Sequence, residues 1–340
     1  MTPFQNKNAL KTRLAPTPSG FLHIGNGASF VATWALVRAF EGKILLRIDD
    51  LDAERMRPEY IEDIFKTLDW LGLDWDEGPF SVDDFFKNWS QHLRLDIYEK
   101  ALNDLAKTGC IYTCSCSRKN IRLNSTNGLY PNTCRNNRLV IDNQVIKYEK
   151  NKALRINIGD NKKINFEKID IREPLSNSMS DFGFRISESS FEVNPSNFDA
   201  NSSNFSVNLS QIMGDFIVSQ KNGLPSYQLA SLVDDTLYNI NFVVRGEDLL
   251  ASTAAQIFLA ETLNQADFLA TTFWHHPLIT DKQGVKLSKS EGATALLVLR
   301  ERNNSAAIVV KQAAMWLGFT DFEGETASEL VNFIKESFEF

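Results

Sequence analysis

The sequence predicts an α/β protein built on a Rossmann-type parallel sheet with helices on both faces. A short strand over Thr12–Ala15 leads through a Pro- and Gly-containing loop into a helix and then into the apolar strand 43–48. A second strand–loop–helix passage follows at 240–263. Continuous apolar strands of this kind are typical of parallel sheets that are buried on both faces. Charged residues at the carboxyl ends of such strands predict a ligand site at that edge.

The composition agrees with an ordinary globular enzyme. The chain has 340 residues, of which 43% are hydrophobic and 23% charged. The N-terminal stretch is polar and no run is long and apolar enough to cross a bilayer, so we expect no membrane contact and a cytoplasmic location. The net charge of −7 argues against indiscriminate nucleic-acid binding. Any RNA contact is therefore expected to be local, for instance at the basic runs 118–138 and 282–289, although either run taken alone is more often a solvated loop.

Three helices are expected in the first part of the chain. The first covers 28–40, where apolar residues recur on one face, and Gly42 is expected to end it in a left-handed conformation. The second begins at Pro58, because proline suits the first helical position. The third runs from about Ser90 to Lys107, and Gly109 closes it.

An inserted subdomain is expected to follow. The alternating runs 139–146 and 153–158 predict strands. From about Ser176 to Ser210 the composition shifts to Ser and Asn, which predicts a mobile insertion. After it, 216–219 and 227–233 flank an Asn-Gly pair, which is typical of a β-hairpin.

The later part of the chain completes the sheet and then turns helical. Strand 240–245 leads into a helix expected over about 252–263, and the residues beyond Ser290 are expected to be helical and too few for another large domain. We therefore expect four segments. They are the first half of the catalytic domain (1–109), an inserted acceptor and zinc subdomain that includes the Ser/Asn-rich insertion (110–210), the second half of the catalytic domain (211–293) and a short helical region (294–340).

His23, Gly25 and Asn26 lie where the first loop enters its helix. Backbone N–H groups at a helix start, helped by the helix dipole, form an anion site, and glycine lets a nucleotide approach the backbone closely. His23 can hydrogen-bond a phosphate oxygen. A His–Gly pair at a helix start is, however, more often a simple cap.

A second candidate phosphate site lies near the other end of the chain. Lys286, Lys289 and two serines occur within five positions, in a Gly-containing loop after an apolar segment. Such a loop can bring its cations to phosphates when ATP binds. Each segment alone is a weak signal, since a Lys/Ser stretch is usually solvated surface. Their combination in one α/β chain is far more specific.

Three of the four cysteines, Cys114, Cys116 and Cys134, are crowded together in the sequence. In a chain of this size such crowding suggests a metal site more than a disulfide framework. Three thiolates suit tetrahedral zinc in a structural role. The alternative is a set of buried thiols, and Cys110 is expected to be a plain free thiol.

The segments His-Ile-Gly-Asn at 23–26 and Lys-Leu-Ser-Lys-Ser at 286–290 resemble the two signatures of class I aminoacyl-tRNA synthetases. Four further segments, in the same order, are similar to the glutamate branch of that class: 13–20 (RLAPTPSG), 46–52 (LRIDDLD), 227–230 (YQLA) and 244–248 (VRGED). Within this branch, LLAST at 249–253 and the pattern Cys-x-Cys…Tyr-Pro-x-x-Cys resemble the glutamyl-queuosine tRNA(Asp) synthetases. The resemblance covers about Thr12 to Ala293, apart from the Ser/Asn-rich insertion.

The resemblance implies a role for each matching residue. The glutamate pocket would consist of Arg13, Ala15, Thr17, Asp49, Tyr227 and Arg245. Asp49 would meet the amino group, and two arginines can supply the guanidinium fork that a carboxylate side chain needs, although a single strand-end arginine is more often part of a structural ion pair. ATP, with magnesium, would be bound by His23, Gly25, Asn26 and Lys289, with His23 and Lys286 along the phosphate path. Tyr130 would be the fourth zinc ligand.

The implied reaction is the activation of glutamate as its adenylate and its transfer to the queuosine base of tRNA(Asp). Full glutamyl-tRNA synthetases read the anticodon with an additional helical region that we do not expect in the residues after Ser290, which favours this acceptor. The alternatives are a truncated glutamyl-tRNA synthetase that charges a 3′ end, a catalytically silent RNA-binding relative, and a small-molecule ligase or nucleotidyltransferase.

Two residues depart from the family pattern. Asn26 stands where many class I enzymes have a second histidine, and Asp49 is one methylene shorter than the usual glutamate.

Overall fold

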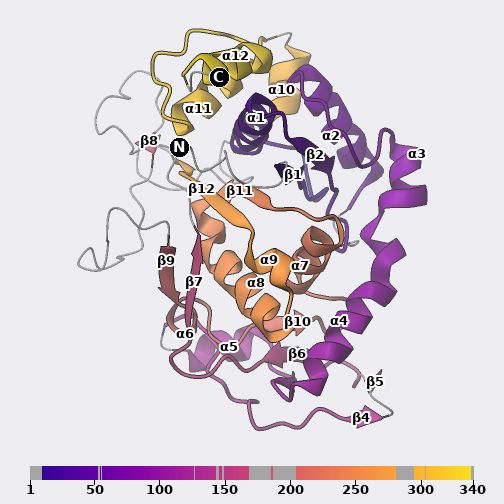
Figure 1. Cartoon of the computed structure of the whole chain (residues 1–340). Helices are drawn as coiled ribbons and strands as arrows, with labels where there is room; N and C mark the ends of the chain where they lie inside the picture. Colours follow the sequence, from indigo (N-terminus) through magenta and orange to yellow (C-terminus); the bar gives the residue numbers. More distant parts are fainter. Residues whose placement is uncertain are drawn as a thin grey trace.

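Two pairs of parallel strands lie at the centre of the fold (Figure 1). The computed structural model describes residues 10–167, 185–186, 204–280 and 295–337, apart from 53, 55, 126, 143, 144, 148 and 303. Strand β1 (Lys11–Leu14) pairs in parallel with β2 (Lys43–Leu46), and β11 (Phe242–Gly246) pairs in parallel with β12 (Thr272–His276). The Asn241 N–H donates to the Lys11 carbonyl at 3.0 Å, which places β11 beside β1. Two parallel strand pairs, β1-β2 and β11-β12, are therefore confirmed as elements of the expected parallel sheet.

Helix α1 (Ile24–Ala39) connects β1 to β2 and covers one face of these strands together with α11 (Ala307–Trp316) and α12 (Ala327–Ser337) (Figure 1). The expected left-handed stop at Gly42 is wrong. Glu41 adopts that conformation, with φ 55°. Gly42 is instead a point of close packing, because a Cβ there would lie 2.6 Å from Val37 Cγ1 and 2.8 Å from the Leu10 carbonyl oxygen.

The other face carries α7 (Tyr227–Leu237), α8 (Leu250–Thr262) and the short α9 (Ala266–Leu269), with the 3-10 turn η4 (Glu247–Leu249) between β11 and α8 (Figure 1). The hairpin expected around Asn222 and Gly223 is wrong in its second half. The turn forms, with Gly223 at φ 86°, but 227–237 is a helix. The Ser226 side chain caps this helix by accepting from the Leu229 N–H, and the apolar residues of its first turns are buried.

The helices between the two halves of the sheet agree with the predictions. Helix α2 (Pro58–Trp70) begins at Pro58. The short elements α3 (Val82–Asp84), η1 (Phe85–Trp89) and η2 (Gln91–Arg94) precede α4 (Leu95–Lys107), so the regular helix starts later than expected. Gly109 follows it with φ 74°.

A three-stranded antiparallel sheet lies beyond α4. Its order is β10-β6-β3, from β3 (Ile111–Cys114), β6 (Ala153–Ile156) and β10 (Ile217–Ser219). Helix α5 (Arg118–Asn124) follows β3, and β4 (Ile141–Asp142) pairs with β5 (Val145–Ile146). The strand expected at 153–158 is thus confirmed with shorter bounds, whereas 139–146 holds two short strands that pair with each other instead of one continuous strand.

The insertion expected at 176–210 ends in regular structure, which corrects that expectation. Strand β9 (Asn204–Asn208) pairs antiparallel with β7 (Lys163–Glu167), and α6 (Leu209–Ile212) follows. The physical reason is burial, since the Phe205 ring packs on Phe166 and Leu209 is fully buried. Strand β8 (Arg185–Ile186) pairs with β13 (Ile279–Thr280), and 176–184 and 187–203 lie outside the described residues.

The last part of the chain is helical, as expected, with α10 (Leu296–Glu301) before α11 and α12. None of the helices described in the structure has the length and apolar character needed to cross a membrane.

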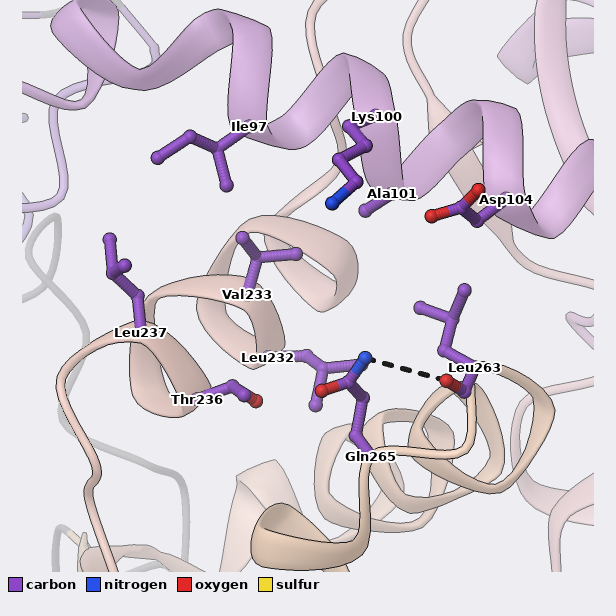
Figure 2. Close-up of a pocket in the computed structure, with 10 residues that line it drawn as sticks. All are labelled: Ile97, Lys100, Ala101, Asp104, Leu232, Val233, Thr236, Leu237, Leu263 and Gln265. Atoms are coloured by element: carbon purple, nitrogen blue, oxygen red, sulfur yellow. Dashed lines mark hydrogen bonds between the residues drawn. The ribbon is translucent and has the colours of Figure 1, made fainter.

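A groove opens between α4, α7 and the residues that follow α8 (Figure 2). Apolar side chains such as Ile97, Val233 and Leu237 line it, with Lys100 and Asp104 at its edge. None of the residues expected in the active site belongs to this groove.

Candidate active site

His23 is the N-cap of α1. Its Nδ1 accepts from the Asn26 N–H at 3.4 Å, while the Asn26 side-chain oxygen accepts from the His23 N–H at 3.2 Å. His23 therefore caps the helix through Nδ1, as the simple capping interpretation of this motif predicts. A neutral imidazole that accepts at Nδ1 carries its proton on Nε2, which is then a donor. The same side chain can therefore cap the helix and offer a donor to a phosphate.

The described residues on both sides of the second signature lie against this turn. Ala295 forms an antiparallel β-bridge with His23, and the Leu296 N–H donates to the Leu22 carbonyl at 2.8 Å. On the other side, Ile279 Cδ1 lies 4.0 Å from the position that a Cβ on Gly25 would take. Lys286 and Lys289 themselves lie outside the described residues.

Arg245, near the carboxyl end of β11, is a buried arginine without an acidic partner within salt-bridge distance in the described part of the chain. Its Nη2 donates to Thr253 Oγ1 at 2.6 Å and to Gln256 Oε1 at 2.9 Å. Its Nε and Nη1 have no hydrogen-bond acceptor among the described residues. Burial lowers the pKa of the Arg245 guanidinium, the Arg13 charge adds to this, and the Tyr227 hydroxyl opposes it.

Arg13 lies at the neighbouring strand and is also buried. Its Nε donates to Asp235 Oδ1 at 3.2 Å and its Nη1 to the Val244 carbonyl at 3.4 Å. Tyr227, at the first turn of α7, is 40% exposed and interacts with the Arg245 guanidinium. The structure thus brings Arg13, Tyr227 and Arg245 together at the carboxyl ends of β1 and β11, whereas their binding roles stay a prediction.

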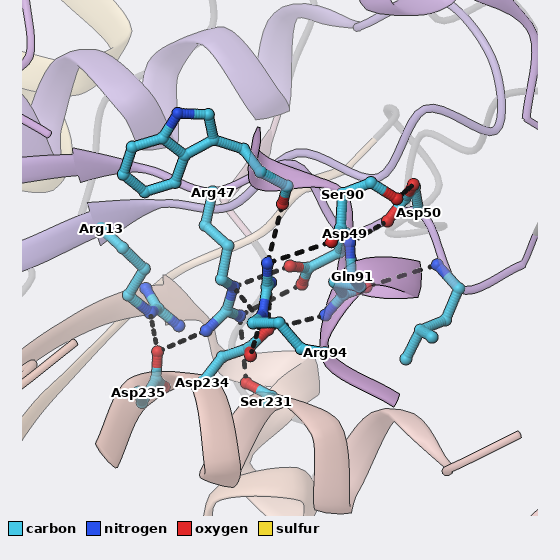
Figure 3. Close-up of polar contacts among 12 residues, drawn as sticks. Arg13, Arg47, Asp49, Asp50, Ser90, Gln91, Arg94, Ser231, Asp234 and Asp235 are labelled. Carbon is cyan, nitrogen blue, oxygen red and sulfur yellow. Dashed lines mark hydrogen bonds and ion pairs between the residues drawn. The ribbon is translucent and has the colours of Figure 1, made fainter. Parts of the chain in front are cut away.

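Asp49 is held by Arg47 rather than standing alone (Figure 3). Arg47 Nε donates to Oδ1 at 2.7 Å and Nη2 to Oδ2 at 3.1 Å. Burial raises the pKa of Asp49, and the Arg47 charge partly opposes this shift. Arg47 Nη1 also donates to Asp235 Oδ1 at 2.6 Å, so Arg13, Asp235, Arg47 and Asp49 form one chain of ion pairs.

The loop after β1 lies against Asp49. The Asp49 N–H donates to the Pro16 carbonyl at 2.9 Å, which holds Ala15 and Thr17 next to this residue. Ala15 is half-buried and Thr17 is exposed. The residues expected for the amino-acid pocket therefore lie along one edge of the sheet.

A second set of buried polar contacts is centred on Asp234 (Figure 3). Asp234 accepts from Arg94 Nε at 3.0 Å, from the Tyr98 hydroxyl at 2.8 Å and from Gln91 Nε2 at 2.9 Å. Sequence reasoning missed Arg47, Arg94 and the Asp234–Asp235 pair. The available signal was a charged residue inside an apolar strand or helix, because a buried charge needs a partner.

The three cysteine sulfurs lie within 4.8 Å of one another. The Cys116 and Cys134 sulfurs are 3.6 Å apart, close to the separation of about 3.8 Å that two thiolates take on a tetrahedral zinc ion. The Tyr130 hydroxyl is 3.4 Å from Cys114 Sγ and accepts from the Cys134 N–H at 2.9 Å. Burial raises the pKa of the Cys134 thiol, but hydrogen bonds to Tyr130, Ser115 and the other thiols outweigh it and bring the pKa to about 7. The four side chains fit a zinc ion.

The cysteine loop is anchored on Asp215, a buried residue next to β10. Its carboxylate accepts from the Tyr112 hydroxyl at 2.7 Å and from Arg135, the neighbour of Cys134, at 2.9 and 3.0 Å. The Arg155 guanidinium lies 3.7 Å from the centre of the Tyr130 ring. Cys110 lies apart, with its sulfur next to the Thr108 carbonyl, as expected for a plain thiol.

The fold and these strand-end residues define the catalytic domain of a class I aminoacyl-tRNA synthetase. The crystal structure of the glutamate–tRNA synthetase from Elizabethkingia anophelis is similar, with a TM-score of 0.57, 22% identity and coverage of 83% of this chain and 53% of that one. The chain belongs to the family of the tRNA synthetases class I (E and Q), catalytic domain, whose model matches residues 9–182 and 195–337.

Two kinds of curated relatives match the chain. The "Glutamate--tRNA ligase 2" of Syntrophus aciditrophicus is 30% identical over 97% of this chain and 61% of its own length. The "Glutamyl-Q tRNA(Asp) synthetase" of Nitratidesulfovibrio vulgaris is 32% identical over 91% of this chain and 86% of its own length, and that of Symbiobacterium thermophilum is 33% identical over 91% and 87%. The chain thus spans between 30% and 61% of the length of the glutamate–tRNA ligases that it matches here, but most of the length of the two glutamyl-Q synthetases. The expected resemblance is confirmed.

Proposed function

We propose that this protein uses ATP to activate glutamate as glutamyl-adenylate and transfers the glutamyl group to the queuosine base of tRNA(Asp). The observation that carries the glutamate part is Arg245, a buried cation that lacks a carboxylate partner in the described part of the chain and retains hydrogen-bond donors. The two relatives named as glutamyl-Q tRNA(Asp) synthetases, which the chain covers over most of their length, support the acceptor.

The charge balance of the site favours an acidic amino acid. Arg13 has Asp235, Arg47 has Asp49 and Arg94 has Asp234, whereas Arg245 has the neutral acceptors Thr253 and Gln256. A buried charge without a counter-charge is costly, and an anionic ligand removes that cost. The side-chain carboxylate of glutamate supplies the missing charge, and the amide of glutamine does not.

Asp49 is the proposed partner of the substrate ammonium group. Arg47 occupies one lone pair on each of its oxygens, and a carboxylate has about four acceptor positions, so capacity remains. Arg47 fixes the direction of this carboxylate and is itself tied to Asp235. Ala15 and Thr17, held beside Asp49, would complete this end of the pocket.

ATP is proposed to lie along the start of α1. Backbone N–H groups there, with Gly25 and Asn26, would receive its phosphates, and His23 would donate from Nε2. Lys286 and Lys289 would stabilise the departing pyrophosphate, which is supported by the contact of their described flanking residues with the His23 turn. Magnesium bound with ATP would supply further positive charge. The glutamate carboxylate attacks the α-phosphorus in line, so these residues act by positioning and charge stabilisation.

The cysteine cluster is proposed to hold a structural zinc ion through Cys114, Cys116, Cys134 and Tyr130. Zinc would cross-link the loop that follows β3 to the loop around Tyr130.

The segments 1–109 and 211–293 are proposed as the two halves of the catalytic domain, with 110–210 inserted between them and 294–340 as a helical end. Strand β10 lies beyond residue 210 and yet pairs with β6, so the inserted sheet draws on both sides of this boundary. A cytoplasmic location stays a prediction.

The acceptor is tested by glutamylation of two forms of tRNA(Asp). One form carries queuosine but lacks its 3′-terminal adenosine, and the other has a complete 3′ end but lacks queuosine. We expect glutamate to be attached to the first and not to the second. The opposite result would favour the second candidate, esterification of a 3′ end, which the glutamate–tRNA ligase relatives support.

A further inference from the structure

The side chain of Arg245 is held from one side by two neutral residues of α8. Its Nη2 donates to Thr253 Oγ1 and to Gln256 Oε1, and both partners are fully buried. Because Nη2 has two N–H bonds, these two acceptors use both of them. The remaining donors of the guanidinium are on Nε and Nη1, which have no acceptor among the described residues.

We infer that Thr253 and Gln256 are positioning residues that fix the plane of the Arg245 guanidinium, so that only Nε and Nη1 remain for the side-chain carboxylate of the amino-acid substrate. This inference rests on the proposed function. It also limits the geometry of recognition, because a bidentate fork normally pairs Nη2 with Nε or with Nη1. With Nη2 occupied, the second oxygen of the carboxylate has to be met by another group, and Arg13 and Tyr227 are the neighbours available.

The neutrality of the two positioning residues matters as much as their geometry. The other buried arginines of this region are each held by an aspartate (Figure 3). A carboxylate in the position of Gln256 would hold Arg245 equally well but would cancel the charge that selects an anionic side chain. Gln256 Nε2 is itself a buried donor without an acceptor in the described structure, so the same spot offers a further N–H to an incoming oxygen.

The test uses substitutions of nearly constant shape. Thr253→Val removes the hydroxyl, and Thr253→Ser keeps it. Gln256→Glu replaces the neutral acceptor by a charged one. Thr262→Val is the matched control, because Thr262 lies on the same helix and its hydroxyl donates only to the Phe258 carbonyl, at 2.8 Å, one turn earlier. The readout is glutamate-dependent ATP–pyrophosphate exchange, with KM determined separately for glutamate and for ATP.

For Thr253→Val we expect the KM for glutamate to rise about 10-fold, the effect of losing one hydrogen bond to a charged group, while the KM for ATP stays within about 2-fold. Thr253→Ser is expected to restore the wild-type value, and Thr262→Val to leave it unchanged. Gln256→Glu is expected to raise the KM for glutamate by about 100-fold.

Equal KM values for glutamate in Thr253→Val and Thr262→Val, or a wild-type value in Gln256→Glu, would overturn the inference and leave the proposed function intact. If Thr253→Val fails to fold, the isosteric Gln256→Glu gives the decisive value. A wild-type protein that exchanges no pyrophosphate with glutamate would overturn both the inference and the proposed function.

Discussion

Ala295 forms an antiparallel β-bridge with His23, the residue that caps α1. The two residues are far apart in the sequence, and the bridge places Ala295, which follows the segment that contains Lys286 and Lys289, at the start of the first helix. Ile279, on the other side of that segment, reaches the same turn at Gly25. This arrangement gives a physical reason to expect that both signatures serve one nucleotide.

Removal of Arg47 is expected to destabilise the protein strongly. Arg47→Met leaves Asp49 and Asp235 buried without their shared cation, and breaking a buried ion pair costs about 3–5 kcal/mol. Arg57→Met, at an exposed pair with Glu59, is the control and is expected to change stability by less than about 0.5 kcal/mol. Urea denaturation measures both. Equal urea midpoints for Arg47→Met and Arg57→Met would show that the ion-pair chain contributes nothing to the stability of the fold.

Asp49→Asn is expected to weaken glutamate binding, because the ammonium group loses its counter-charge. We expect the KM for glutamate to rise at least about 10-fold with little change in the KM for ATP.

In the wild type, lowering the pH through the pKa of Asp49 removes the same charge. Since burial raises this pKa, the acid limb of the pH profile of pyrophosphate exchange is expected at a pH above the usual pKa range of an aspartate. Pyrophosphate exchange against pH checks this, and an unchanged limb in Asp49→Asn would assign it to another group.

The cysteine cluster is expected to hold one equivalent of zinc in protein purified without added metal. Cys134→Ser removes one of the three thiolates and is expected to reduce the zinc content severely, whereas Cys110→Ser, outside the cluster, keeps it. Elemental analysis measures the content. Less than about a third of an equivalent in the wild type would contradict a zinc site.

Much of the fold could be predicted from local patterns in the sequence. The apolar strands, the helix that starts at Pro58 and the crowding of three cysteines were all visible because each depends on neighbouring residues. The second half of the expected hairpin failed because the cap at Ser226 and the burial of α7 against α8 outweighed the turn signal. A turn specifies the reversal of the chain but not whether the next element is a strand or a helix.

The residues of the candidate site were easier to predict than the buried charged residues that hold them in place. Arg13 and Arg245 lie near strand ends, where parallel sheets collect ligands, and His23 lies at the start of the helix that follows the first strand. The partners Arg47 and Asp235 come from distant segments, and one sequence does not show which buried charges will meet. The helix cap made by His23 and Asn26 depends on side-chain geometry that the motif alone leaves open.

Glutamate-dependent ATP–pyrophosphate exchange in the Lys289→Ala variant tests the central claim most directly, with Lys66→Ala on the surface of α2 as a control. We expect the wild type and the control to exchange pyrophosphate at similar rates. Lys289→Ala is expected to be slower by roughly 100-fold or more, the scale of losing one charge contact to the transition state. A rate near that of the wild type would contradict a single nucleotide site shared by His23 and Lys289.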